Sequence, residues 1–115
     1  MTFILNILAP QSYQRIIGAR PNDTSMVYRI SVVFKGKVQG VRFREYARRW
    51  AEMLSLNGYV QNMSDGSVHA VFEGQHQAVQ EIIRKLKNEH PNAEVAHIDI
   101  QVEEPEGLEG FKIIH

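Results

Sequence analysis

The segment GKVQGVRFR, residues 36–44, joins a predicted strand to a predicted helix. Before it, apolar residues recur at every second position over residues 28–34, a period typical of a strand with one buried face. After it, apolar residues recur at helical spacing over residues 43–54. The junction therefore contains two glycines, Gly36 and Gly40, and two arginines, Arg42 and Arg44, at the start of the helix.

The order of the remaining elements predicts the fold class. We expect a strand from residue 27, a helix over 43–56 that Asn57-Gly58 ends, extended runs over 59–62 and 67–73, a helix over 75–89, and strands over 95–102 and 111–114. The sequence MSDG, residues 63–66, supplies an Asp-Gly turn for a hairpin. This βαββαβ order predicts an α+β sandwich in which two helices pack on one face of an antiparallel sheet.

Periodicity also predicts the core. Apolar residues on one face of a strand or helix mark the side that packs inward. The predicted inward positions are Val68, Ala70 and Phe72 in the hairpin, Val79, Ile82, Ile83 and Leu86 in the second helix, and Ala96, Ile98, Ile100 and Val102 in the fourth strand.

The composition excludes several kinds of site. The 115 residues include no cysteine, which excludes disulfides, thiolate metal sites and a cysteine nucleophile. The 13 Lys and Arg balance the 13 Asp and Glu, so no overall charge attracts nucleic acid or a membrane surface. The five histidines are scattered without the spacing of metal ligands, so we expect no metal and no cofactor. We expect each of them to be solvated or at the rim of the fold: His69, His76, His90, His97 and His115.

Residues 1–26 differ from the rest of the chain because they show no sustained periodicity. We expect a boundary near Met26, with an N-terminal extension over residues 1–26 and one domain over 27–115. The apolar run over residues 3–8 has no Lys or Arg before it, and no run reaches membrane-spanning length. The sequence predicts a cytoplasmic monomer that binds neither nucleic acid nor membrane. Its extension either has no chemical role or mediates self-association.

Two interpretations of the glycine segment follow from general chemistry. Glycine permits unusual dihedral angles at which successive N–H groups converge into an anion-binding nest, and the start of the following helix attracts the same anion. A cation in the first helical turn opposes the helix dipole, but a bound dianion reverses that effect for Arg42 and Arg44. The other interpretation is an ordinary glycine turn with solvated arginines. The spacing fits neither a Walker loop nor a dinucleotide fingerprint.

Two motifs resemble those of the acylphosphatase family. The family pattern G-x-V-Q-G-V-x-F-R matches residues 36–44, and its second pattern, G-[YW]-V-x-N-x-x-D-G-x-V, matches residues 58–68. The resemblance covers about residues 27–115. It implies a ferredoxin-like fold, Arg44 as the substrate-binding arginine and Asn62 as the residue that orients the attacking water. It also implies a phosphate-binding loop made of Lys37, Val38, Gln39, Gly40, Val41 and Arg42.

The sequence departs from the family pattern at two positions. Arg42 stands where the family usually has a small residue, Gly or Cys, so a bulky cation lies at the exit of the loop or points into solvent. Met63 replaces what is often a threonine or another polar residue, which removes a possible hydrogen bond near Asn62. Neither departure changes Arg44 or Asn62.

The resemblance implies metal-free hydrolysis of small acyl phosphates to a carboxylate and inorganic phosphate. Two alternatives stay open, a non-catalytic binding module for RNA or protein and a carbamoyl-phosphate-handling relative. An RNA-recognition domain shares the element order, but presents aromatic residues where this chain has SVHAVFEG, residues 67–74. Acylphosphatase-like domains also occur in carbamoyl-transferring maturation enzymes for hydrogenases. A purely structural subunit that has kept the fold would need a decayed site, and the site residues Arg44 and Asn62 are both present.

Overall fold

The computed structural model describes residues 27–115, so the predicted extension over residues 1–26 and its boundary lie outside the described residues. The elements in chain order are β2 (Tyr28–Lys37), α1 (Phe43–Met53), β3 (Asn57–Asn62), β4 (Val68–Gly74), α2 (His76–Asn88), β5 (Glu94–Glu103) and β6 (Phe111–Ile114). Within this part of the chain, no helix is long and apolar enough to cross a membrane.

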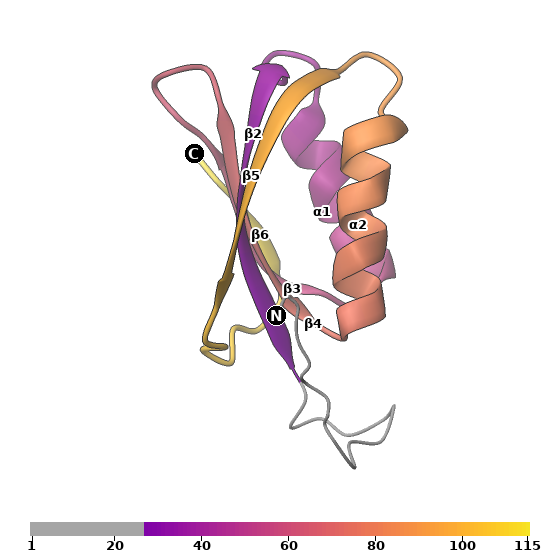
Figure 1. Cartoon of the computed structure of the whole chain (residues 1–115), viewed down its shortest axis with the longest axis vertical. Helices are drawn as coiled ribbons and strands as arrows, with labels where there is room; N and C mark the ends of the chain where they lie inside the picture. The colour runs from indigo at the N-terminus through magenta and orange to yellow at the C-terminus, as the bar shows by residue number, and fades with distance from the viewer. Residues whose placement is uncertain (1–26) are drawn as a thin grey trace.

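The strands form one five-stranded sheet in the order β5-β2-β4-β3-β6. Neighbouring strands are antiparallel except β3 and β6, which pair in parallel. Both helices lie on the same face of the sheet (Figure 1). The predicted α+β ferredoxin-like architecture is therefore confirmed, and the parallel β6 makes the sheet a mixed one.

The core lies between the helices and the inner face of the sheet. Val68, Ala70 and Phe72 of β4 are all fully buried, as the alternation predicted. The buried residues of α2 are the predicted Val79, Ile82 and Leu86, while Ile83 is half-buried at the margin. The remaining large side chains of this core include Ile30, Val32 and Phe34 from β2 and Phe43 from α1.

The first helix is shorter than predicted, because α1 ends at Met53 rather than at residue 56. The residue that leaves the helical path in a left-handed conformation is Ser55, with φ of 58°, and not Asn57 or Gly58. Asn57 and Gly58 instead begin β3 and pair with Glu73 and Phe72. The Asn-Gly pair resembled a helix stop because both signals use a residue that tolerates positive φ.

The predicted inward face of β5 is only partly buried. Ile100 and Val102 face the same side as the buried Val32 and Ile30 with which they pair, yet they are 49% and 62% exposed. The reason is position, because among the strands of residues 27–115 β5 lies at the edge of the sheet and has β2 as its single neighbour. Coverage by a helix thus decides whether the inward side is buried. The prediction is wrong at Ala96, which is exposed while Val95 packs against the core, because the register of β5 with β2 shifts between Lys35 and Gly36.

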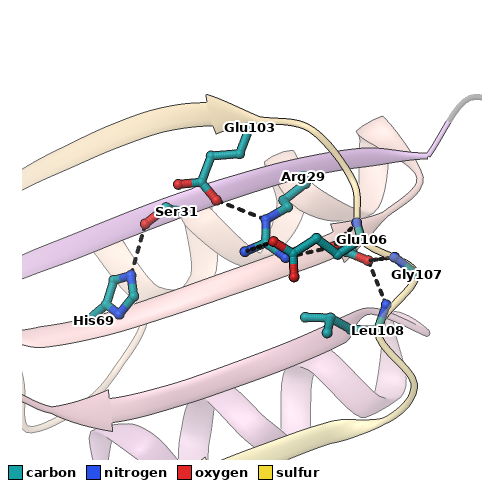
Figure 2. A network of polar contacts seen from close by, with 8 residues as sticks. Arg29, Ser31, His69, Glu103, Glu106, Gly107 and Leu108 are labelled. Atoms are coloured by element: carbon teal, nitrogen blue, oxygen red, sulfur yellow. Dashed lines mark hydrogen bonds and ion pairs between the residues drawn. The ribbon is translucent and has the colours of Figure 1, made fainter.

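The loop between β5 and β6 is attached to the sheet by a buried carboxylate. Glu73, 1% exposed, accepts a hydrogen bond from Arg29 at 2.7 Å and others from the backbone N–H groups of Glu106, Gly107 and Leu108. Arg29 also donates to Glu103 at 2.8 Å. Figure 2 shows this network, which holds the loop that leads into β6.

Candidate active site

A pocket of about 300 Å³ lies where three parts of the chain meet: the start of α1 with the loop before it, the end of β3, and β6 with the residue after it. The loop contributes Val38, Gly40 and Arg42 to its lining. Gly40 and Arg42 both have positive φ, 75° and 61°. The backbone of this loop is therefore in the conformation that lets neighbouring N–H groups converge.

Three residues of the predicted phosphate-binding loop do not line the pocket. Lys37 is the last residue of β2 and is exposed. Val41 is half-buried and packs against the core. The Gln39 side chain donates two hydrogen bonds of 2.8 Å, to the carbonyl oxygens of Met63 and Ser67. Gln39 thus joins the loop to the β3–β4 turn.

The start of α1 has no side-chain cap. Its N-cap residue is Arg42, which makes no side-chain capping hydrogen bond, and the first turn contains one acidic residue, Glu45. The first N–H groups of a helix have no intrahelical acceptor and carry the positive end of its dipole. Phe43, Arg44 and Glu45 of this turn all line the pocket. An uncapped helix start that opens on a pocket favours an anionic ligand.

The side chain of Arg44 is hydrogen-bonded to β6, the last strand in the order of the described sheet. Its Nη1 donates to the carbonyl oxygen of Ile114 in β6 at 3.3 Å. An arginine has five N–H donors, so most of them stay available for a ligand. The parallel pairing of β6 with β3 brings Ile114 here, since Ile114 lies beside Gln61.

The contribution of β6 to the pocket was not predicted from the sequence. Ile113 and His115 both line the pocket, although the sequence predicted His115 only as a solvated or rim residue. No local pattern marks them, because their place depends on the pairing of β6 with β3. Ile113 and His115 could have been predicted as pocket residues only from the parallel pairing of β6 with β3.

Asn62 lines the same pocket from the end of β3. It is exposed, and it is the last residue of the strand, opposite Val68 of β4. Met63 follows it, is 40% exposed and does not line the pocket, although its carbonyl oxygen accepts the bond from Gln39. The structure therefore brings the predicted pair, Arg44 and Asn62, to one pocket from two different elements.

The family model for acylphosphatase matches residues 30–113. The chain belongs to the acylphosphatase family. An acylphosphatase from Trichormus variabilis is 43% identical over 95 residues, which are 81% of this chain and 94% of that protein. The predicted family is thus confirmed, and with it the prediction of an enzyme of the acid-anhydride hydrolase class.

Solved acylphosphatase structures have the same fold. The acylphosphatase from Bacillus subtilis superposes with a TM-score of 0.74 at 32% identity, over 78% of this chain and 100% of that one. The acylphosphatase from Coxiella burnetii superposes with a TM-score of 0.76, also at 32% identity, over 81% of this chain and 99% of that one. This family member therefore has the family fold over most of its length.

Proposed function

We propose that this protein hydrolyses the carboxyl-phosphate anhydride bond of small acyl phosphates and releases a carboxylate and inorganic phosphate, without a metal ion. The observation that carries the proposal is the shared pocket, which Arg44, Asn62 and the uncapped start of α1 all line. Family membership supports the same reaction.

The phosphate group binds at the start of α1. Its oxygens accept hydrogen bonds from backbone N–H groups of the loop around Gly40 and of the first helical turn, where the helix dipole favours negative charge. Arg44 adds a planar, charged donor, oriented by its hydrogen bond to Ile114. Phosphoryl transfer depends mainly on positioning and on stabilisation of the equatorial oxygens, so these donors supply the charge that a metal ion often provides.

Asn62 orients the attacking water. Its side-chain amide accepts through the carbonyl oxygen and donates through the NH₂ group, so it can hold one water molecule in line with phosphorus. A phosphate oxygen of the substrate takes the proton of that water. The bond from the bridging oxygen to phosphorus breaks, and the leaving group is a carboxylate. Because a carboxylate is stable at neutral pH, the reaction needs no strong general acid.

Removing either side chain tests these roles. We expect Arg44→Ala and Asn62→Ala each to lower kcat for benzoyl phosphate by about 10²–10³-fold, as loss of one preorganised donor does in comparable sites. Phosphate release is measured with EDTA present, because the proposed reaction uses no metal ion. A folded variant that keeps the activity of the unsubstituted chain would overturn the role assigned to its residue.

Matched controls separate these roles from general effects of substitution. Arg49→Ala removes an exposed arginine from α1 outside the pocket, and Asn88→Ala removes an exposed asparagine from α2. Both controls should keep full activity. The anhydride should also react much faster than p-nitrophenyl phosphate, whose leaving group is poorer. Loss of activity in EDTA would contradict the metal-free reaction.

A further inference from the structure

Arg42 has an unusual backbone conformation for its residue type. Its φ of 61° and ψ of 32° are left-handed, a region that an L-residue with a Cβ atom enters at a steric cost and that glycine enters freely. Strained residues of this kind cluster at functional sites. The position thus holds an arginine where glycine would fit the backbone better, which points to a use for its side chain.

The charge of Arg42 is not balanced by the protein around it. It is exposed and lines the pocket, and none of the ion pairs formed within residues 27–115 includes Arg42 or Arg44. The pocket lining contains one acidic side chain, that of Glu45. Two guanidinium groups and the positive end of the helix dipole therefore face the same small volume.

The reacting phosphate does not require both arginines. Under the proposed function, backbone N–H groups and Arg44 bind that phosphate, and Arg44 is already oriented by Ile114. Arg42 has no such restraint, and its planar fork of donors suits a carboxylate or a phosphate equally well. Its side chain is thus available for a different group of the substrate.

In-line displacement sends the leaving carboxylate away from the attacking water. If Asn62 holds that water, the acyl portion leaves on the side away from Asn62, and the exposed lining residues other than Asn62 are Gly40, Arg42, Glu45 and His115. Glu45 repels an anionic acyl group, and an arginine is charged at every relevant pH. Among these residues, Arg42 is therefore the one whose side chain offers the acyl portion a permanent positive charge.

We propose that Arg42 binds a second anionic group, so that the preferred substrates are acyl phosphates whose acyl portion carries its own carboxylate or phosphate-like group. This inference rests on the proposed function of the same pocket. It assigns Arg42 to substrate choice, in addition to any contact of its backbone with the reacting phosphate.

Three substrates that differ at one position test the inference. They are 4-carboxybenzoyl phosphate, 4-phosphonobenzoyl phosphate and the uncharged reference 4-carbamoylbenzoyl phosphate. We expect kcat/KM for at least one charged substrate to exceed that of the reference by about threefold to fivefold, the upper part of the range of an exposed ion pair. The two charged substrates show which anion is preferred. Because salt screens exposed charges, the preference should decrease at high ionic strength.

Variants then assign the preference to one side chain. Arg42→Gln should reduce the ratio of kcat/KM for the charged substrate to kcat/KM for the uncharged reference to about one. Arg42→Lys should keep part of the preference for the charged substrate, because a lysine retains the charge without the planar fork. The matched control is Arg49→Gln, which removes an exposed arginine from α1 outside the pocket and should leave the ratio unchanged.

The outcomes separate this inference from the proposed function. The inference would be overturned, with hydrolysis persisting, if the charged-to-uncharged ratio of kcat/KM were near one in the unsubstituted chain. It would also be overturned if that ratio were the same in Arg42→Gln as in the unsubstituted chain. An equal loss on all three substrates in Arg42→Gln would also overturn it, because Arg42 would then serve only the reacting phosphate. Failure of the unsubstituted chain to hydrolyse benzoyl phosphate and all three substrates would overturn the proposed function, and this inference with it.

Discussion

At the scale of single residues, Gly58 of β3 lies too close to the backbone of β4 to carry a side chain. A Cβ atom placed on Gly58 would lie 1.9 Å from the carbonyl oxygen of Val71 and 2.8 Å from its carbonyl carbon. The φ of Gly58 is +140°, which residues with side chains rarely adopt. Gly58 also begins the contact with β6, since its N–H donates to the carbonyl oxygen of Gly110 at 2.9 Å.

We therefore expect Gly58→Ala to destabilise the fold by about 2–4 kcal/mol, since it adds backbone strain to a steric clash that only movement of β4 relieves. Urea unfolding, followed by the free energy of unfolding, measures this effect. The end of the same strand carries Asn62, so activity should decrease even at temperatures where the variant is folded.

Gly66→Ala is the matched control for that substitution. Gly66 also has positive φ, +93°, but no atom lies within 4 Å of the Cβ position. Its cost should be about 1 kcal/mol, from the backbone conformation alone. Equal destabilisation by the two variants would show that contact with Val71 is not what requires glycine at position 58.

At the scale of elements, the Glu73 carboxylate of β4 positions the loop that leads to β6. Burial alone raises the pKa of the Glu73 carboxyl, but hydrogen bonds from Arg29 and from the backbone N–H groups of Glu106 and Leu108 outweigh burial and hold that pKa below its usual value. Since the Ile114 carbonyl of β6 accepts a hydrogen bond from Arg44, the buried network around Glu73 supports the pocket as well as the fold.

We expect Glu73→Gln to lower the free energy of unfolding at pH 7 by about 2–4 kcal/mol, because it removes the buried charge opposite Arg29. The lowered folded-state pKa determines the direction in which stability changes with pH. Glu73 contributes this stability above its unfolded pKa, about 4.3, and loses it as the pH falls through the lower folded value. Urea unfolding between pH 7 and pH 3 should therefore show a steeper loss for the unsubstituted chain than for Glu73→Gln.

Glu52→Gln serves as the control because it removes an exposed carboxylate, 53% exposed, from a pair with Arg48 on α1. Such surface pairs contribute about 0–1 kcal/mol. Parallel pH curves for Glu73→Gln and the unsubstituted chain would rule out Glu73 as the source of the acid sensitivity.

At the scale of the whole molecule, the two helices within residues 27–115 cover the centre of the sheet and leave the β5 margin exposed. Ile82 of α2 is completely buried in the core, while Ile100 of the edge strand β5 is 49% exposed. Both were predicted to face inward, from helical spacing in one case and alternation in the other. The two isoleucines therefore test how much burial, rather than residue type, contributes to stability.

We expect Ile82→Ala to cost about 2–5 kcal/mol because it leaves a cavity in the packed core. Ile100→Ala should cost less than about 1 kcal/mol, since water already reaches that side chain. Thermal and urea unfolding of both variants measure the difference. Similar losses for the two would mean that the outer half of β5 is covered in solution.

The sequence determined the order of elements, the inner faces of β4 and α2, and the loop with Arg44, because these depend on residues close together in the chain. Periodicity reports the environment of a single element, and the two motifs identify the family directly. Only the tertiary structure decided that Gln39 reaches the Met63 and Ser67 carbonyls, that β6 brings Ile114 to Arg44, and that neither described helix buries Ile100 and Val102 of β5. These features depend on strand register and helix coverage between distant segments, which no local pattern records.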